Sequence, residues 1–74
     1  MNISLISQEL RDVGISSLSI KNDSTIIIDD KTMLYLKSYK APYIEIFEKI
    51  DDKFIFIHSV SSIGKAIEFL MEYT

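Results

Sequence analysis

The strongest constraint on this chain is an alternation of two kinds of side chain along five strand-like segments. Neighbouring residues on a strand point to opposite faces of a sheet, so one sheet built from these segments has two chemically different faces. The aliphatic face consists of Leu18, Ile20, Ile26, Ile28, Leu34, Leu36, Ile44, Ile46, Ile55 and Ile57. The intervening positions carry six of the eight aromatic residues together with charged ones. The second face is therefore too apolar to be an ordinary solvent-facing surface.

The links between the segments predict how the strands are connected. The segments cover residues 18–21, 25–29, 33–39, 43–49 and 53–59. The links contain Asn, Asp, Ser, Lys and Pro, which is typical of turns. Short links favour antiparallel neighbours, because a parallel crossover needs about a dozen residues or more. We therefore predict an antiparallel meander.

A helical pattern precedes the strands. Its apolar residues recur every three or four positions, at Ile3, Ile6, Leu10 and Val13, and this spacing places them on one helix face. Asn2 or Ser4 is suited to cap its start, and Gly14 is suited to end it. Leu5 is the apolar residue that falls on the polar side of this helix.

A second helix is predicted over residues 63–73, after Ser61 or Ser62 as its cap. Five strands span roughly 20 Å, and two helices of about 10 Å each cover one such face and no more. We therefore predict one α+β domain over residues 1–74, with both helices packed on the aliphatic face of a five-stranded antiparallel meander. The alternative is a curled, barrel-like sheet that buries part of the aromatic face.

The composition narrows the class of function. The chain has no cysteine, which excludes disulfides, thiol catalysis and zinc–thiolate sites. Its net charge of −3 disfavours non-specific binding to a polyanion without forbidding a local basic patch. No segment approaches the roughly 20 apolar residues of a membrane helix, and residues 1–14 lack the features of a secretory signal. We expect a cytoplasmic protein with no membrane partner.

The aromatic face is the candidate functional surface. Exposed apolar patches usually mark interaction sites, and Tyr, Phe and Met are enriched at the centres of interfaces. The structural alternative is that cross-strand aromatic pairs stabilise the sheet while lysine stems cover the rings. The predicted partner-binding residues are Met33, Tyr35, Lys37, Tyr39, Tyr43, Glu45, Phe47, Lys49, Phe54, Phe56 and His58.

The expected partner is another protein or a second copy of the chain in a homodimer. Single-stranded nucleic acid is the alternative, because aromatic residues on a sheet can stack on bases while lysines contact phosphates. The single arginine, Arg11, the negative net charge and the lack of an RNA-binding motif weigh against nucleic acid.

The tetrad Ile-Asp-Asp-Lys occurs twice, at residues 28–31 and 50–53. Alternate turns of a meander lie at the same end of the sheet, so the four aspartates could form an acidic edge for a hard cation. However, the spacing matches no calcium loop, and aspartate is a favoured turn residue. We predict two similar hairpin turns and no cofactor.

His58, with Ser59, Ser61 and Ser62 nearby, offers an imidazole next to hydroxyl groups. Adjacent strand residues point apart, and no third group or oxyanion site can be named, so we do not expect an enzyme. The segment 61–65 opens a helix, where free amides can hold an anion. It lacks the P-loop pattern, and the serines are better interpreted as caps.

The order of helix, antiparallel strands and helix resembles that of the double-stranded RNA-binding domain. That family has a basic cluster at the start of its second helix, where this chain has only Lys65, and it has three strands where five are predicted here. In outline the chain also looks like small phage-encoded inhibitors of bacterial nucleases, including anti-CRISPR proteins. Its opening, Met1-Asn2-Ile3 with Leu5, Ile6 and Glu9, is similar to one of them. This resemblance implies a non-enzymatic inhibitor or accessory protein of a phage or mobile element.

Overall fold

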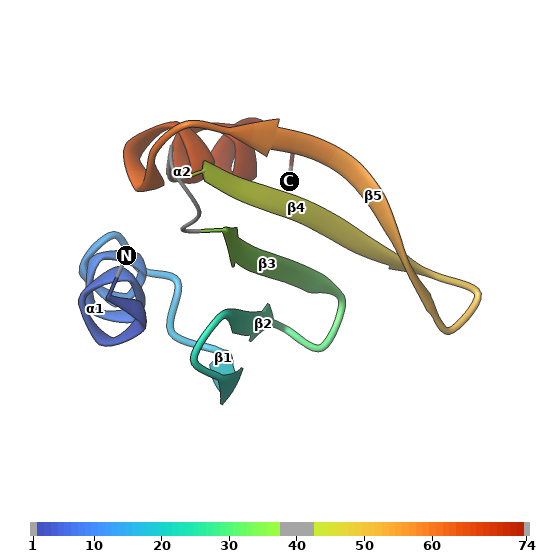
Figure 1. Ribbon diagram of the computed structural model, residues 1–74, viewed down its shortest axis with the longest axis horizontal. Helices are drawn as coiled ribbons and strands as arrows, with labels where there is room; N and C mark the ends of the chain where they lie inside the picture. The colour runs from blue at the N-terminus through green and yellow to red at the C-terminus, as the bar shows by residue number, and fades with distance from the viewer. Residues whose placement is uncertain (1, 38–42, 74) are drawn as a thin grey trace.

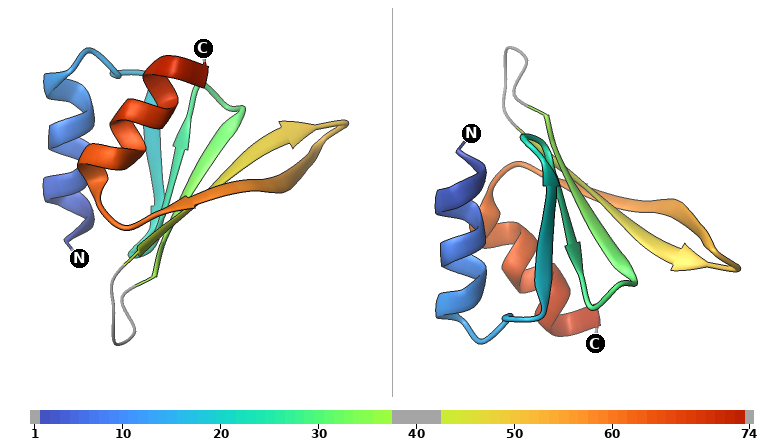
Figure 2. Two further views of the ribbon diagram at one scale, coloured as in Figure 1. Left: turned by 90° about the horizontal axis from the view of Figure 1, so that it is seen from above. Right: turned by 90° about the horizontal axis from the view of Figure 1, so that it is seen from below.

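Two helices lie on the same side of one antiparallel sheet (Figures 1 and 2). The computed structural model describes residues 2–37 and 43–73. Its elements are α1 (Ile3–Asp12), β1 (Leu18–Asn22), β2 (Thr25–Ile28), β3 (Thr32–Lys37), β4 (Tyr43–Ile50), β5 (Lys53–Val60) and α2 (Ile63–Tyr73). The five strands pair in chain order. The predicted two-layer α+β fold with an open meander is confirmed.

The core lies between the helices and the aliphatic face. Strand register aligns the buried residues in rows, because Ile26 pairs with Leu34 and Leu34 pairs with Ile46. The fully or largely buried apolar residues are Ile6, Leu10, Ile26, Ile28, Leu34, Leu36, Ile44, Ile46, Ala66 and Leu70. Both helices and the three central strands therefore contribute to one continuous core.

Residues that the sequence predicts as helix caps lie at both ends of α1 and at the start of α2. The Asn2 side-chain oxygen accepts a hydrogen bond from the backbone N–H of Ser4 at 2.9 Å and from that of the next residue at 3.3 Å. Gly14, with φ of +98°, follows α1 in a conformation that suits glycine. The Ser62 hydroxyl accepts from the Lys65 N–H at 3.3 Å. Ser62 is therefore the cap of α2, as predicted.

The two Ile-Asp-Asp-Lys segments form turns of the same kind. All four aspartates have positive φ, at 53° and 57° for Asp29 and Asp30 and at 51° and 65° for Asp51 and Asp52. Positive φ at both central residues is the mark of a type I′ turn, whose twist matches that of the strands it joins. The prediction of two similar turns is confirmed. Within residues 2–37 and 43–73, no group of three acidic or imidazole side chains is placed to hold a metal.

The β4–β5 hairpin projects beyond the helix layer (Figure 2). Its strands have eight residues each and are about 26 Å long, whereas helices of 10 and 11 residues are about 15–17 Å long. Ile50 and Ile55 point to the helix side beyond the helices and are 49% and 44% exposed. The predicted helix cover of the aliphatic face therefore stops short of the hairpin tip.

A β-bulge in β5 changes the face that its second half presents. Phe56 pairs with Phe47, but His58 pairs with Ile46, so Ile57 is an extra residue in β5. An extra residue shifts the alternation of side chains by one position. His58 therefore shares a face with the fully buried Ile46. The prediction that His58 lies on the aromatic face is wrong, because period-two counting does not register a bulge.

Candidate functional site

The sheet face opposite the helices, here called the open face, carries a continuous apolar row. Ile27 pairs with Met33, Met33 with Phe47, and Phe47 with Phe56. These four residues, called the apolar row, lie side by side across β2, β3, β4 and β5 because cross-strand partners share a face. At β1 the row ends in a polar residue, Ser19, which pairs with Ile27.

Contacts within the apolar row leave it accessible to another molecule. The rings of Phe47 and Phe56 meet edge to face, with their centroids 5.7 Å apart. Such a pair contributes roughly 0.5–1.5 kcal/mol. Phe56 is nevertheless 52% exposed, and Ile27, Met33 and Phe47 are only partly buried. The row therefore stabilises the sheet locally and still presents apolar surface.

Tyrosines and lysines surround the apolar row. Tyr35 is 37% and Tyr43 36% exposed. The Lys37 ammonium lies 4.7 Å from the centroid of the Tyr35 ring, and the Lys49 ammonium lies 6.0 Å from that of Phe54. Both distances are in the range of cation–π contacts. The structural alternative, in which lysines cover the rings, is therefore realised at these two rings but not over the apolar row.

Most of the predicted binding residues lie together on the open face. The register places there Met33, Tyr35, Lys37, Tyr43, Glu45, Phe47, Lys49, Phe54 and Phe56. Tyr39 lies outside the described residues. His58 lies on the other face, where its ring stacks on Phe69 of α2 with centroids 4.7 Å apart. Ile27 belongs to the row, and the alternation of side chains assigns it to this face, but it was not among the predicted binding residues.

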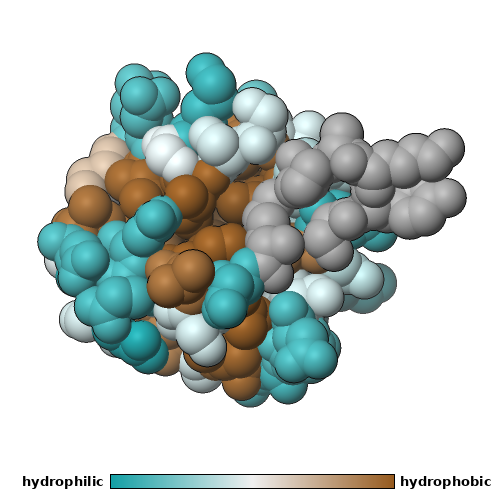
Figure 3. All heavy atoms as spheres, turned by 60° about the vertical axis from the view of Figure 1, so that its left-hand side comes forward, coloured by the Kyte–Doolittle hydropathy of each residue, from teal (hydrophilic) through white to brown (hydrophobic). Residues whose placement is uncertain are grey.

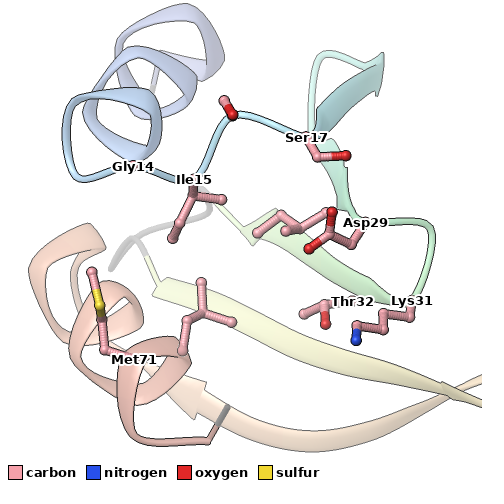
Figure 4. Close-up of a pocket in the computed structure, with 10 residues that line it drawn as sticks. Gly14, Ile15, Ser17, Asp29, Lys31, Thr32 and Met71 are labelled. Carbon is pink, nitrogen blue, oxygen red and sulfur yellow. The ribbon is translucent and has the colours of Figure 1, made fainter.

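A hollow of about 540 Å³ lies between the C-terminal ends of both helices and the β2–β3 turn (Figure 4). Asp29, Lys31, Ser17 and Thr32 supply its labelled polar groups. Asp29, Lys31 and Ser17 are exposed to solvent, and the Asp29 N–H donates to the Ser17 carbonyl at 2.7 Å. The charged groups of the hollow are therefore screened by water, and the Asp29 N–H is already hydrogen-bonded within the fold. These features do not form a specific ligand-binding site.

A second apolar surface lies on the helix side (Figure 3). A shallow hollow of about 320 Å³ there is lined by Leu5, Ile6 and Ile63, with Asn2 and Glu9 beside them. Leu5 is 65% exposed, in agreement with its predicted place on the polar side of α1.

The groups around His58 do not form a catalytic arrangement. Ser59 pairs with Glu45 and so belongs to the open face, while His58 stacks on Phe69 on the helix side. The Ser62 hydroxyl caps α2. The imidazole and the Ser59 hydroxyl therefore lie on opposite faces of β5, as expected for adjacent strand residues.

Comparison of the chain with protein families, curated proteins and solved structures finds no match. Within the part of the chain that the structure describes, no helix is long and apolar enough to cross a membrane.

Proposed function

We propose that this chain is a non-enzymatic domain that binds another protein through its open face. The observation that carries the proposal is the apolar row, which crosses four strands on the side of the sheet that the helices leave uncovered. A sheet normally needs a second layer on each apolar face. Both helices of the chain pack on the aliphatic face, so a partner is the natural cover for the other one.

The chemistry of the open face favours a protein over single-stranded nucleic acid. Bases stack on freely accessible rings, and phosphates need lysines nearby. Lys37 and Lys49 instead lie over Tyr35 and Phe54, and Glu45 stands between them in the same sheet face. An apolar centre with charged residues at its rim is the usual anatomy of a protein interface.

An inhibitor or accessory protein of a phage or mobile element is the setting that we propose for this binding. It is supported by the resemblance of the opening segment and by the small size and acidic charge of the chain. The open face would then cover a surface of the target, and no chemistry by this chain would be required.

Photocrosslinking in the native cells tests this proposal. A photoreactive phenylalanine analogue replaces Tyr35 on the open face or, as a matched control, Leu5 on the helix side, which is also exposed. We expect a specific protein to crosslink from position 35 and not from position 5. The variant Phe56→Ser should lose this partner while keeping its circular dichroism spectrum, because Phe56 is half-exposed.

Salt dependence separates the two kinds of partner. Binding to an apolar protein surface should tolerate moderate salt, whereas binding to a labelled oligothymidylate should weaken steeply and disappear in Lys37→Glu/Lys49→Glu. Oligonucleotide binding with that salt dependence, or crosslinking only from position 5, would overturn the proposal.

A further inference from the structure

The two edges of the sheet differ in how well they are protected from pairing with another strand. Unpaired edge strands attract further strands unless they are short, charged or irregular. β1 has five residues, carries Lys21 and has a register shift before Asn22. β5 has eight residues, and after Lys53 it continues with four apolar residues, 54–57. Its distal half belongs to the hairpin that projects beyond the helices (Figure 2). The bulge at Ile57 and the charged Lys53 limit this exposure to residues 54–56, which form the least protected stretch of either edge.

The hydrogen-bond pattern shows which backbone groups of β5 point outwards. The Lys49 N–H donates to the Lys31 carbonyl at 2.7 Å, on the β3 side of β4. Backbone groups alternate in direction along an antiparallel strand, so the neighbouring residues Glu48 and Ile50 point towards β5. Their partners there are Ile55 and Lys53.

It follows that the backbone groups of Phe54 and Phe56 point away from β4. Within the described residues no strand lies on that side of β5. The side chain between them, Ile55, is 44% exposed, and that of Phe56 is 52% exposed. The edge thus presents free backbone donors and acceptors next to apolar side chains.

We propose that β5 pairs antiparallel with β5 of a second copy of this chain, about a twofold axis at Ile55. The two five-stranded sheets then form one continuous sheet of ten strands. Phe54 of each copy lies opposite Phe56 of the other, and both residues have outward-pointing backbone groups. These two pairs each exchange two N–H···O bonds, while the two Ile55 residues meet as a pair without hydrogen bonds.

Neighbouring registers pair fewer of the outward-pointing backbone groups of β5. Centring the pairing on Phe54 would place Phe56 opposite Asp52, a turn residue with φ of 65° that cannot continue a strand. Centring it on Phe56 would place Phe54 opposite His58, which lies beyond the bulge and pairs with Ile46 of β4. In the register centred on Ile55, Phe54 and Phe56 of both copies therefore all form hydrogen-bonded pairs. The paired segment ends at the bulge.

Charges near the ends of the paired segment are complementary. In this register Lys53 lies opposite Ile57 of the second copy, on the helix side of the sheet. The flank of α2 beside β5 forms a hollow whose charged lining residues are Lys65, Glu68 and Glu72. Glu68 and Glu72 are exposed. This flank has two carboxylates and one lysine, so its excess of negative charge is complementary to Lys53 of the second copy.

This inference does not depend on the proposed function. Pairing through the edge leaves the open faces of both copies uncovered, and it places their apolar rows in one continuous sheet. A domain that self-pairs in this way presents two binding surfaces to a partner, which raises avidity for a repeated or symmetric target.

Molar mass across a wide dilution series is the first test, measured by light scattering for the wild type and three variants. Ile55→Lys places two like charges opposite each other at the twofold axis and should raise the dissociation constant by ~10-fold or more. Ile50→Lys, an equally exposed position on the adjacent strand, is the matched control. Tyr35→Ser reports on the open face. We expect a dimer that only Ile55→Lys abolishes.

A crosslink gives the second test, since the chain has no cysteine of its own. Opposite residues in a pair without hydrogen bonds have Cα atoms about 4.5 Å apart, within the range of about 4.4–6.8 Å that a disulfide spans. Ile55→Cys should therefore form a disulfide-linked dimer rapidly under mild oxidation. Ile50→Cys should not, because three strand spacings across the sheet and four residues along it separate this position from its copy by roughly 19 Å.

Two results would overturn this inference. One is a wild type that stays monomeric throughout the dilution series, with Ile55→Cys oxidising no faster than Ile50→Cys. The other is a dimer that survives Ile55→Lys and is lost in Tyr35→Ser, which would place the contact on the open face. Loss of partner crosslinking from position 35, by contrast, would contradict the proposed function and leave the edge pairing intact.

Discussion

Two neighbouring isoleucines allow the difference between the two faces to be measured with one chemical change. Ile26 and Ile27 follow each other in β2. Ile26 is fully buried on the helix side, and Ile27 is partly exposed in the apolar row on the open face. Because both positions belong to the same strand, changes in strand propensity largely cancel when the two variants are compared.

The expected costs follow from burial. Truncating a buried Ile to Val costs about 0.5–1.5 kcal/mol and truncating it to Ala about 2–5 kcal/mol. At Ile27 the removed groups are already partly in contact with water, so we expect about 0.4 kcal/mol or less for Val and about 1 kcal/mol for Ala. A 74-residue domain has about 4–11 kcal/mol of stability in total. Ile26→Ala can remove most of it, so the valine pair is measured first.

Urea denaturation at low protein concentration gives the required free energies of unfolding. The m-values of all variants should match, because the surface exposed on unfolding is nearly unchanged. Equal costs at Ile26 and Ile27 in dilute protein would refute the assignment of the two faces. A cost at Ile27 that rises with protein concentration would instead show that the open face is covered by self-association.

Three further substitutions test the local structure by the same denaturation assay. Asn2→Ala should lower the free energy of unfolding by about 1 kcal/mol, because two backbone N–H groups lose their acceptor; an unchanged value would show that α1 does not depend on this cap. Asp52→Ala should destabilise by about 1–2 kcal/mol while Asp52→Gly should not, since φ is 65° there; equal effects would contradict the type I′ turn. Asp30→Asn should leave stability unchanged within error, because its contact with Lys49 is 3.9 Å long and the Asp30 side chain is 90% exposed; a clear loss would reveal a stronger ion pair.

The candidate site was predictable wherever the alternation of side chains is unbroken. Met33, Phe47 and Phe56 lie on the face that period-two counting assigns to them. His58 does not, because the extra residue Ile57 reverses the count within β5. Ile57 packs against the core, and His58 gains a stacking contact with Phe69. Both contacts involve residues distant in the sequence, so no local pattern signals the bulge.

The sequence predicted how the helices cover the sheet across its width but not along the length of its strands. Sheet width and helix diameter correctly place both helices on one face. How far the helices cover the sheet along the strands depends on the difference between strand length and helix length. Because β4 and β5 are longer than the helices, Ile50 and Ile55 remain exposed near the hairpin tip. At the opposite edge Ile20 is 44% exposed for a related reason, since an edge strand has a neighbour on one side only.

The sequence by itself determined the order and type of the elements, the antiparallel connections and the chemistry of each face. These properties follow from local rules: side-chain period, capping groups and the turn preference of aspartate. Only the tertiary structure decided the bulge in β5, the projection of the β4–β5 hairpin and the direction of the free backbone groups at Phe54 and Phe56. These features depend on register and on where the helices pack, which are properties of contacts between elements and not of any single segment.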